Sequence, residues 1–430
     1  MKKYFHQVIA SEISQFSQFY NKTWRLYPVS QDYDLNQDIK CAKKGTIQTE
    51  SEFLQIEDGD LILLDGNLNY NEDIQEFLTS IGKRLGRHSR LTIVLYNSYL
   101  KVFYRLASFL KLRSGALPSV FLTKVNLENL CRLSGYELVR LKSTVYLPFY
   151  IPIISNLVNS ILPMIPWLRN FSFAQIAVLR PIIIEKTPPS ISIIIPARNE
   201  KDNIRSAIQR IPQFLTNNIE IIFVEGNSTD DTWNEIQKCV EDYKGHLKLS
   251  YYKQTGKGKK DAVDVGFANA TGDILTILDA DLTMPPENLV QFYNAYVCGL
   301  GDFINGNRLF YPMENKAMRP LNLLGNIFFA KSLSFVLGEE LADTLCGTKL
   351  FSRKHYLMML GWNKNFGSFD PFGDFEMIFP SAVLGMGVVN VPIKYRNRTY
   401  GETNIQRFYH GLMLFKMTLI GLLRIKLGKT

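Results

Sequence analysis

The chain has 430 residues, a length that exceeds one ordinary domain and predicts two. Hydrophobic residues make up 46% of it and charged residues 21%, which excludes collagen-like, disordered and disulfide-rich classes. The net charge of +9 favours an anionic partner such as a nucleotide diphosphate, an acidic membrane surface or nucleic acid. Five scattered cysteines form no CxxC pair, so we expect reduced thiols in a cytoplasmic protein and no zinc site.

The first half alternates apolar strand patterns with helical patterns. We expect strands at 60–64, 91–96, 136–141 and 173–179, and helices at 73–85, 99–112 and 125–134. This alternation is typical of a parallel, doubly wound α/β sheet.

Two segments suggest contact with a membrane. No charged residue lies between Lys142 and Arg169, but four prolines break helices there, which favours a lipid-facing or substrate-covering lid over a membrane span. The basic run 411–430 fits an amphipathic helix on an anionic surface, with a terminal helix packed on the core as the alternative. The basic N-terminus has no apolar segment, so we expect no signal peptide. These features predict a cytoplasmic protein, with peripheral contact to the membrane.

A proline-containing boundary at 185–190 separates the two halves, giving expected domains at 1–185, 190–410 and 411–430. In the second half we expect strands at 191–195, 220–224, 247–252 and 273–278, and helices at 203–215, 231–243 and 260–270. This is a second α/β pattern, whose ligands lie beyond the carboxyl ends of the strands.

Polar residues follow the first two of these strands. Pro196, Arg198 and Glu200 come directly after the first, and Glu225 ends the second. A carboxylate at such a strand tip can accept hydrogen bonds from a base or a ribose. We therefore interpret all four residues as candidates for binding the nucleotide part of a donor.

The next two loops carry weaker signals. Asp230 and Asp231 precede a helix, so capping that helix is the alternative to a ligand contact. The loop 254–261 contains Lys257, Lys259 and Asp261 and precedes a helix, a setting in which amides and ammonium groups can approach a phosphate. It lacks the GxxxxGK[ST] pattern, and a solvated lysine cluster is the alternative.

The strongest signal is Asp279-Ala280-Asp281 at the end of an apolar strand. Two carboxylates one residue apart can converge on a hard cation, because Mg²⁺ and Mn²⁺ prefer oxygen ligands. Such a cation would bridge a donor diphosphate, and Ala280 would lie beside that donor. Two exposed turn aspartates would be the alternative.

A second acidic cluster contains Asp374 and Glu376. Either carboxylate is a candidate base for the acceptor, and the two point the same way only if the segment is extended. Capping of a following helix by Asp374 is the alternative. Downstream, Lys394, Arg396 and Arg398 are candidates for holding a phosphate.

Over about 190–410 the chain resembles the family 2 glycosyltransferases, especially the dolichyl- and polyprenyl-phosphate mannosyl- and glucosyltransferases. The resemblance rests on an ordered set of motifs: Ile195-Pro-Ala-Arg-Asn-Glu200, Val224-Glu-Gly-Asn-Ser-Thr-Asp230, Ala270-Thr-Gly-Asp273, Asp279-Ala-Asp-Leu282, Gly306-Asn-Arg308, Asp343-Thr-Leu-Cys-Gly-Thr-Lys349, Asp374-Phe-Glu-Met377 and Arg398-Thr-Tyr-Gly-Glu-Thr403.

This resemblance implies a GT-A fold and metal-dependent, inverting transfer from a GDP- or UDP-sugar to a membrane-associated acceptor, lipid-linked or glycan. It implies that Asp279 and Asp281 bind Mn²⁺ or Mg²⁺ and the diphosphate. Glu225 would lie at the nucleotide, and Arg308 and Arg398 near phosphates. No nucleic-acid partner is implied.

The same resemblance makes Asp374 the candidate base. One departure concerns the donor, because Glu225-Gly226 stands where the family usually has two aspartates, and this leaves GDP and UDP both open.

The first half resembles the later part of a class I S-adenosylmethionine-dependent methyltransferase, through residues 60–65, 90–97 and 174–181. The glycine-rich cofactor loop of such enzymes is absent from residues 1–59, which implies a truncated, Rossmann-like domain without cofactor binding. A methyltransferase acting on a glycan, with the second half as a binding module, is the alternative function.

Overall fold

The computed structural model describes residues 2–28, 34–110, 117–312, 320–366, 370, 373–397 and 407–427. The chain divides into two compact units. The N-terminal unit contains the chain up to Ile183 together with Val383–Gly385 and the residues from Leu423, and the C-terminal unit contains the remainder. Each unit is an α/β structure built on its own sheet, as the sequence predicts.

The N-terminal sheet has the strand order β2-β1-β3-β4-β6-β5. Its strands are β1 (Thr23–Leu26), β2 (Lys44–Ile47), β3 (Leu61–Asp65), β4 (Arg90–Tyr96), β5 (Tyr136–Thr144) and β6 (Ala174–Pro181). The four expected strands all form. The expectation of a purely parallel sheet is wrong, because β6 pairs antiparallel with both β4 and β5. The four-residue strands β1 and β2 were not predicted, since runs this short carry no clear period.

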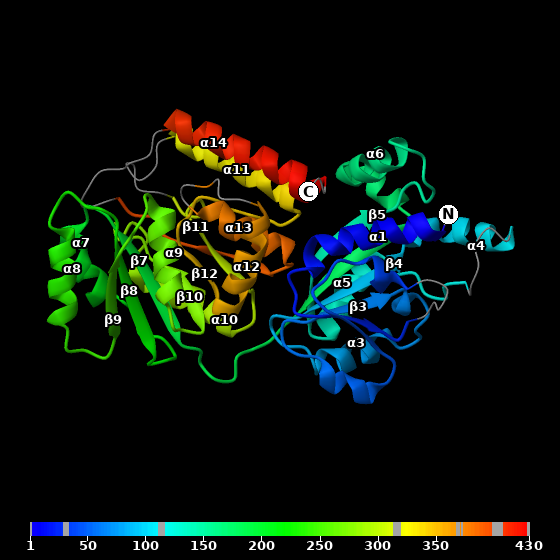
Figure 1. The fold of residues 1–430 in the computed structure, drawn as a ribbon, viewed down its shortest axis with the longest axis horizontal. Coiled ribbons are helices and arrows are strands. Elements are labelled where there is room, and N and C mark those ends of the chain that lie inside the picture. Colours follow the sequence, from blue (N-terminus) through cyan, green and yellow to red (C-terminus); the bar gives the residue numbers. More distant parts are fainter. Residues whose placement is uncertain are drawn as a thin grey trace. The chain divides into compact units, whose positions relative to one another are not determined.

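Helices and 3₁₀ turns lie between these strands in the chain (Figure 1). They are α1 (Lys2–Ser17), α2 (Leu35–Asp38), α3 (Ile74–Gly82), α4 (Lys101–Phe109), α5 (Lys124–Leu133) and α6 (Ile154–Ile161), with 3₁₀ turns η1 (Glu50–Gln55), η2 (Asn67–Asn69), η3 (Ser98–Leu100), η4 (Leu162–Met164) and η5 (Pro166–Phe171). The segment expected as a lid, 142–169, thus contains one short α-helix and two 3₁₀ turns between β5 and β6.

The C-terminal sheet has seven strands in the order β13-β11-β12-β10-β7-β8-β9. They are β7 (Ile191–Ala197), β8 (Ile219–Glu225), β9 (Lys248–Lys253), β10 (Ile274–Ile277), β11 (Phe303–Asn307), β12 (Lys349–Ser352) and β13 (Val388–Pro392). The four predicted strands form and pair in parallel. The sheet is mixed, because β12 runs antiparallel to both of its neighbours.

The helices of this unit are α7 (Lys201–Gln209), α8 (Thr232–Glu241), α9 (Lys259–Asn269), α10 (Leu289–Val297), α11 (Pro320–Leu337), α12 (Arg353–Phe366), α13 (Asp374–Val383) and α14 (Arg407–Gly421), with the 3₁₀ turn η6 (Pro286–Asn288) and the π-helical turn η7 (Leu422–Lys426). The expectation of a helix to residue 215 is wrong. Helix α7 ends at Gln209 because Pro212 disfavours the helical conformation at Ile211 and removes a backbone donor.

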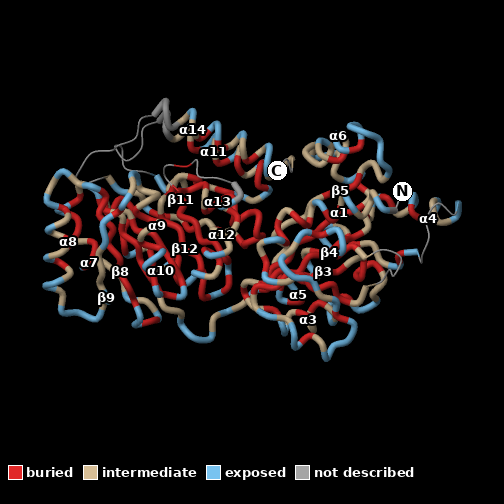
Figure 2. Tube along the Cα trace, viewed as in Figure 1, coloured by how far each residue is buried: buried red, intermediate tan, exposed pale blue. Residues whose placement is uncertain are grey.

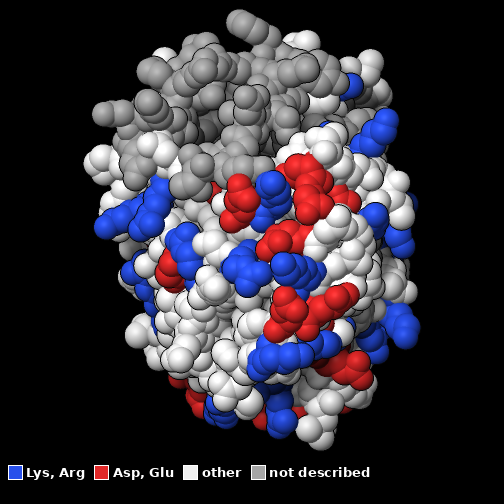
Figure 3. Space-filling model, turned by 90° about the vertical axis from the view of Figure 1, so that its left-hand side faces the viewer, with Lys and Arg blue, Asp and Glu red and all other residues white. Residues whose placement is uncertain are grey.

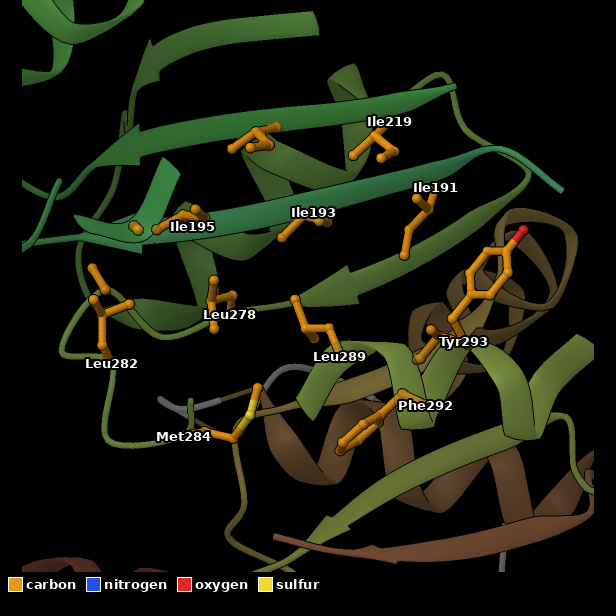
Figure 4. Packing of buried hydrophobic residues seen from close by; sticks show 14 of the residues in the cluster. Ile191, Ile193, Ile195, Ile219, Leu278, Leu282, Met284, Leu289, Phe292 and Tyr293 are labelled. Carbon is orange, nitrogen blue, oxygen red and sulfur yellow. The ribbon is translucent and has the colours of Figure 1, made fainter. Parts of the chain in front are cut away.

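The inner strand β7 is buried on both faces, which explains its continuous apolar sequence. On one face Ile191 and Ile193 pack toward Leu289 and Phe292 of α10 (Figure 4). Figure 2 shows the buried residues of each unit gathered along its sheet.

On the other face of β7, Gly266 brings α9 close to the strand. A Cβ atom at Gly266 would lie 2.4 Å from Cγ2 of Ile194, so only glycine permits this approach. This packing fixes where the first residue of α9, Lys259, enters the loop region described next.

Candidate active site

Polar side chains collect at one edge of the C-terminal sheet. Strands β7, β8, β9 and β10 are parallel, so their carboxyl ends share this edge. The antiparallel strand β12 begins there, because Leu350 pairs with Thr276 near the end of β10. Residues that follow β7 to β10 therefore meet residues that precede β12, although the two groups lie far apart in the sequence.

Asp279 lies two residues beyond β10 and binds Lys259, the first residue of α9, through a short salt bridge. Each side chain keeps 30% of its surface exposed. Burial would raise the pKa of Asp279, but Lys259, Lys349 and Arg308 outweigh this and lower it. These three cations thus stabilise the charged form of the Asp279 carboxylate.

Gly347 closes one side of this pair. A Cβ atom at this position would lie 2.3 Å from Nζ of Lys259 and 2.5 Å from Oδ2 of Asp279. The φ angle of Gly347 is not in the left-handed region, so glycine is needed here for the close approach and not for the backbone conformation. The loop before β12 therefore shapes the space around Asp279.

Asp281 forms an Asx turn, in which its Oδ1 accepts from the backbone N (3.1 Å) and Oγ1 (2.8 Å) of Thr283. Burial would lower the pKa of Lys259, but Asp279, Asp374 and Asp281 outweigh this effect, so that the pKa is raised. The ammonium group of Lys259 therefore interacts electrostatically with three carboxylates, two of which belong to the predicted metal motif. Ala280 between them is buried in the core.

No group of three or more His, Cys, Asp or Glu side chains surrounds a single point within the described part of the chain. A divalent cation at Asp279 and Asp281 would therefore need further oxygen ligands from a bound molecule. The ammonium of Lys259 shows that a positive charge is accommodated against Asp279.

The second acidic cluster opens helix α13, which begins at Asp374. Asp374 forms a short salt bridge with Lys349, whose side chain is fully buried, and Lys349 also donates to the backbone oxygen of Cys346. Capping falls to Asp370, whose Oδ2 accepts from the backbone N of Phe375 at 2.7 Å.

Glu376 points elsewhere, because two positions along a helix differ by about 200°. Its carboxylate lies 3.2 Å from Nζ of Lys260, which also binds Asp264 at 2.6 Å. The two candidate bases thus diverge and have separate lysine partners, the helical outcome of the two that the sequence left open.

Arg308 follows β11 and forms a bidentate ion pair with Asp343, at 2.6 Å from Nε to Oδ2 and 2.8 Å from Nη2 to Oδ1. The Asp343 side chain is fully buried. Burial would raise its pKa, but the guanidinium of Arg308 outweighs this and lowers it. The Arg308 guanidinium also stacks 5.3 Å from the ring centroid of Tyr395, so its orientation is fixed on two sides.

Two of the residues predicted to bind the nucleotide, Glu225 and Glu200, form hydrogen bonds with nearby residues of their own loops. Glu225 is buried and its Oε1 accepts from the backbone N of Ser228. Glu200 is buried and accepts from Nδ2 of Asn203 at 2.7 Å. Pro196 lies within β7, and Arg198 directly follows that strand. Asp230 accepts from the backbone N of Thr232 at 3.0 Å, which agrees with its alternative role at the start of α8, while Oδ1 of Asp231 accepts from Nδ2 of Asn234 at 2.6 Å.

The loop after β9 is closed by Asp261, whose Oδ2 accepts from the backbone N of Gly256 at 2.7 Å, while Lys257 is exposed. Beside it, Gln254 is 8% exposed, and its Oε1 has no hydrogen-bond partner among the described residues. A Cβ atom at Gly226 would lie 3.6 Å from this oxygen, an ordinary contact distance. A buried acceptor without a donor is unusual in a folded protein.

Arg398 lies outside the described residues. Arg396 does reach the site edge, since its backbone N donates to the backbone oxygen of Thr283 at 2.9 Å, next to Asp281. Lys394 lies two residues before it, just after β13.

The structure also adds residues to which the sequence assigned no role: Asp343, Gly347, Lys349 and Gln254. Three of them belong to the motif Asp343–Lys349 that carried the family resemblance. A lysine and an aspartate at the two ends of an otherwise uncharged motif were the available signal, since buried charges require partners.

Residues 192–357 match the family model described as glycosyl transferase family 2. These residues form a glycosyl transferase family 2 domain. This glycosyltransferase region includes Asp279, Arg308 and Lys349, whereas Asp374 lies beyond the match.

Two relatives with similar sequences agree with this match. A dolichyl-phosphate hexose transferase of Haloferax volcanii is 28% identical over 232 residues, covering 54% of this chain and 93% of that protein. A dolichol-phosphate mannosyltransferase of Pyrococcus furiosus is 35% identical over 120 residues, covering 27% of this chain and 33% of that protein. Among solved structures, glucosyl-3-phosphoglycerate synthase of Mycobacterium tuberculosis with UDP is 20% identical, with a TM-score of 0.39, covering 56% of this chain and 80% of that one.

Two surface properties complete the description. None of the described helices is long and apolar enough to cross a membrane. On the face of the C-terminal unit shown in Figure 3, basic and acidic side chains are interspersed, so the net positive charge is not gathered there into one patch.

Proposed function

We propose that the C-terminal unit is a GT-A glycosyltransferase that moves a sugar from a GDP- or UDP-sugar, with inversion, to a lipid-linked acceptor such as a polyprenyl phosphate. The observation that carries the proposal is Asp279, held charged beside Lys259 and Lys349 at the carboxyl edge of a family 2 sheet. A diphosphate requires both cations and a metal-binding carboxylate, and this edge supplies them together.

The donor would be bound by the loops at this edge. Asp279 and Asp281 would hold Mn²⁺ or Mg²⁺, completed by diphosphate oxygens, and this ion would stabilise the charge that grows on the leaving group. Lys259 and the exposed Lys257 would bind the phosphates, together with Arg308 and Arg398. The Oε1 of Gln254, which has no hydrogen-bond partner among the described residues, would accept a hydrogen bond from the base, with Glu225 ordering the adjacent loop.

In the transfer step an acceptor oxygen forms a bond to C1 of the sugar, while the bond from C1 to the diphosphate breaks and its electron pair leaves with the nucleoside diphosphate. If the acceptor oxygen carries a proton, Asp374 would receive it. Asp374 forms a salt bridge with Lys349, and accepting a proton would weaken this contact. Glu376, bound to Lys260, is the alternative base.

A lipid-linked acceptor is supported by the relatives, whose names include dolichyl-phosphate and undecaprenyl-phosphate transferases. It is also supported by α11 and α14, which lie side by side (Figure 1). Both helices lack acidic residues, and they expose Leu324 (65%), Phe328 (55%), Leu412 (70%) and Phe415 (55%). Such a surface fits peripheral contact with the cytoplasmic face of a membrane. A soluble glycan is the alternative acceptor.

We also propose that the N-terminal unit, although methyltransferase-like, does not bind S-adenosylmethionine. Arg25 of β1 bridges Asp34 (2.9 Å) and Asp65 (3.0 Å) at the carboxyl edge of this sheet. An ion-pair network there leaves these two carboxylates engaged with protein rather than with a ribose. Calorimetry with S-adenosylmethionine should give no heat of binding, and micromolar binding would overturn this part.

The main test is a thermal-shift panel of GDP- and UDP-sugars with Mn²⁺, because a ligand of the native state raises Tm. One nucleotide sugar should raise Tm in the wild type and fail to do so in Asp281→Ala. That sugar should then be transferred to a polyprenyl phosphate. If no nucleotide sugar stabilises the protein, or if Asp281→Ala transfers at the wild-type rate, the proposal fails.

A further inference from the structure

In helix α6 of the N-terminal unit, polar side chains are buried and apolar side chains are exposed. A helix on a globular domain normally turns its apolar stripe to the core. In α6 the inward residues are polar: Ser155 is 0% exposed and Asn159, four residues later, is 8% exposed. The outward residues are apolar: Ile154, Leu157 and Ile161 are 51%, 56% and 42% exposed.

Hydrogen bonds hold this orientation. The Oγ of Ser155 accepts from the backbone N of Ile151 at 2.7 Å. The Oδ1 of Asn159 accepts from the backbone N of Tyr146 (2.7 Å) and of Leu147 (2.9 Å). Turning the apolar stripe inward would strip the preceding loop of these partners, so the exposure of the apolar residues is built into the fold.

Further exposed apolar residues lie in the segments on both sides of α6 and in α4. Asn97, before η3, donates from Nδ2 to the backbone oxygens of Asn170 (3.0 Å) and Ser172 (2.8 Å), which joins the start of α4 to η5. In α4 only Tyr104 is buried. We call apolar face the exposed residues of these elements: Tyr99 (64%), Val102 (72%), Phe103 (60%), Leu106 (52%), Phe109 (82%), Tyr150 (60%), Ile153 (81%), Ile154, Leu157, Ile161, Trp167 (75%) and Phe171 (61%). Figure 2 shows α4 and α6 largely exposed.

Within the segments that form the apolar face, the charged residues have one sign. The chain contains no Asp or Glu at 77–127 or at 138–184, which include all of these elements, whereas Lys101, Arg105 and Arg169 lie within them. Exposed Trp and Tyr beside cations are typical of proteins at the interface of a bilayer with water. Two copies of this face would instead bring cations against cations across a two-fold axis, which disfavours a dimer.

We propose that the apolar face docks the N-terminal unit onto the surface of an anionic phospholipid bilayer. The apolar side chains enter the headgroup region, and the cations bind lipid phosphates. The face lies outside residues 192–357, so this proposal stands independently of the sugar transfer.

The test is flotation of the full chain with vesicles of phosphatidylcholine containing roughly 30% phosphatidylglycerol, in the range of anionic cytoplasmic leaflets. The wild type should float, and less of it should float with phosphatidylcholine alone. The variant Ile153→Ser/Leu157→Gln/Trp167→Gln should lose at least about tenfold in partitioning, because three large apolar groups no longer leave water.

A matched control is Leu54→Gln/Val125→Gln/Leu133→Gln, which alters three residues of the same unit that are 74%, 63% and 65% exposed and lie outside the apolar face. It should float like the wild type. Both variants change exposed side chains, and their Tm and donor-induced thermal shift should match the wild type.

Fluorescence gives a second readout, because Trp167 is 75% exposed whereas Trp24 and Trp362 are buried and Trp233, in α8, is half-buried. Vesicles should shift the emission to the blue, and Trp167→Phe should abolish the shift. The proposal is overturned if the wild type does not float, if the triple variant floats equally well, or if that variant changes only the oligomeric mass of the protein.

Discussion

Lys259, the first residue of α9, forms a salt bridge with Asp279, which lies two residues beyond β10. The ammonium occupies the position against the carboxylate that a divalent cation would take. Lys259 therefore has two partners in turn under the proposed function. It neutralises Asp279 in the protein alone, and it turns to the phosphates when the donor brings a metal ion.

Lys259→Gln should bind Mn²⁺ more tightly than the wild type when no donor is present. The competing ammonium is removed, and we expect the gain to be about tenfold, the size of a partly screened charge interaction. The donor should bind more weakly, because its phosphates lose a cation. Calorimetry with Mn²⁺ alone and then with the nucleotide sugar measures both effects.

Lys244→Gln, a change of the same charge at an exposed residue before the start of β9, whose other end carries the site loop, is the control and should leave both affinities unchanged. Weaker Mn²⁺ binding by Lys259→Gln would contradict the idea of competition.

Gly347→Ala should impair transfer without unfolding the protein. The added Cβ meets Nζ of Lys259 and Oδ2 of Asp279, so both side chains must move. A displacement near 1 Å in a catalytic site typically costs about 100-fold in rate. We expect kcat/KM to fall by about 10- to 100-fold, measured beside an unfolding curve.

Gly325→Ala in α11 is the matched substitution, since a Cβ there meets nothing within 4 Å. It should keep full activity, with unchanged or slightly raised stability. Equal activity of both variants would contradict the role of Gly347.

The sequence predicted the edge of the sheet where the candidate site lies, because apolar strands ending in polar residues are a local pattern. Asp279 and Asp281 were predicted this way as site residues, and so was Glu225. The pairing of Lys259 with Asp279 was not predictable, since it depends on α9 packing against β7 through Gly266. Long-range contacts of this kind leave no periodic signal in one sequence.

Strand β12 illustrates the same limit. Its four residues, Lys349–Ser352, begin with a lysine, and a charged residue argues against a buried strand. The lysine is buried because Asp374, 25 positions later, supplies its countercharge. Likewise, α6 could not be oriented from its apolar spacing, because its polar residues bind the preceding loop and turn inward.

Lys349→Met should lower the free energy of unfolding more than the similar size of the two side chains suggests. Asp374 would lose its partner in a buried setting, and leaving one charge of a buried pair alone costs about 3–5 kcal/mol in the free energy of unfolding. The double variant Lys349→Met/Asp374→Leu should recover much of this loss, because no buried charge remains. Urea unfolding measures the stability of all three proteins, and a double variant as unstable as the single one would argue against the pair.

Asp374→Asn and Glu376→Gln separate the two candidate bases. Asp374→Asn should lower kcat by at least about 100-fold if it takes a proton from the acceptor, within the usual range for a general base. Glu376→Gln loses a contact with Lys260, which remains bound to Asp264, and should retain most of the activity. The opposite order of activities would assign the base to Glu376.

The Arg308–Asp343 pair should make stability depend on acid. The native-state pKa of Asp343 is lowered from 3.8, with Arg308 outweighing the effect of burial. A lowered native-state pKa means that the unfolded chain takes up the proton first as the pH falls. The stabilisation is therefore fully present above the pKa of the unfolded state, near 4, and is lost as the pH falls through the lower native-state pKa.

Asp343→Asn removes this titration and leaves Arg308 without its countercharge. At pH 7 it should cost about 3 kcal/mol in the free energy of unfolding, as for one partner of a buried pair. Urea titrations of both proteins from about pH 7 to pH 3 should show the difference narrowing only below about pH 4, where Asp343 begins to be protonated in the unfolded wild type. A difference that stays constant over this range would show that the carboxylate of Asp343 contributes through its shape and hydrogen bonds and not through its charge.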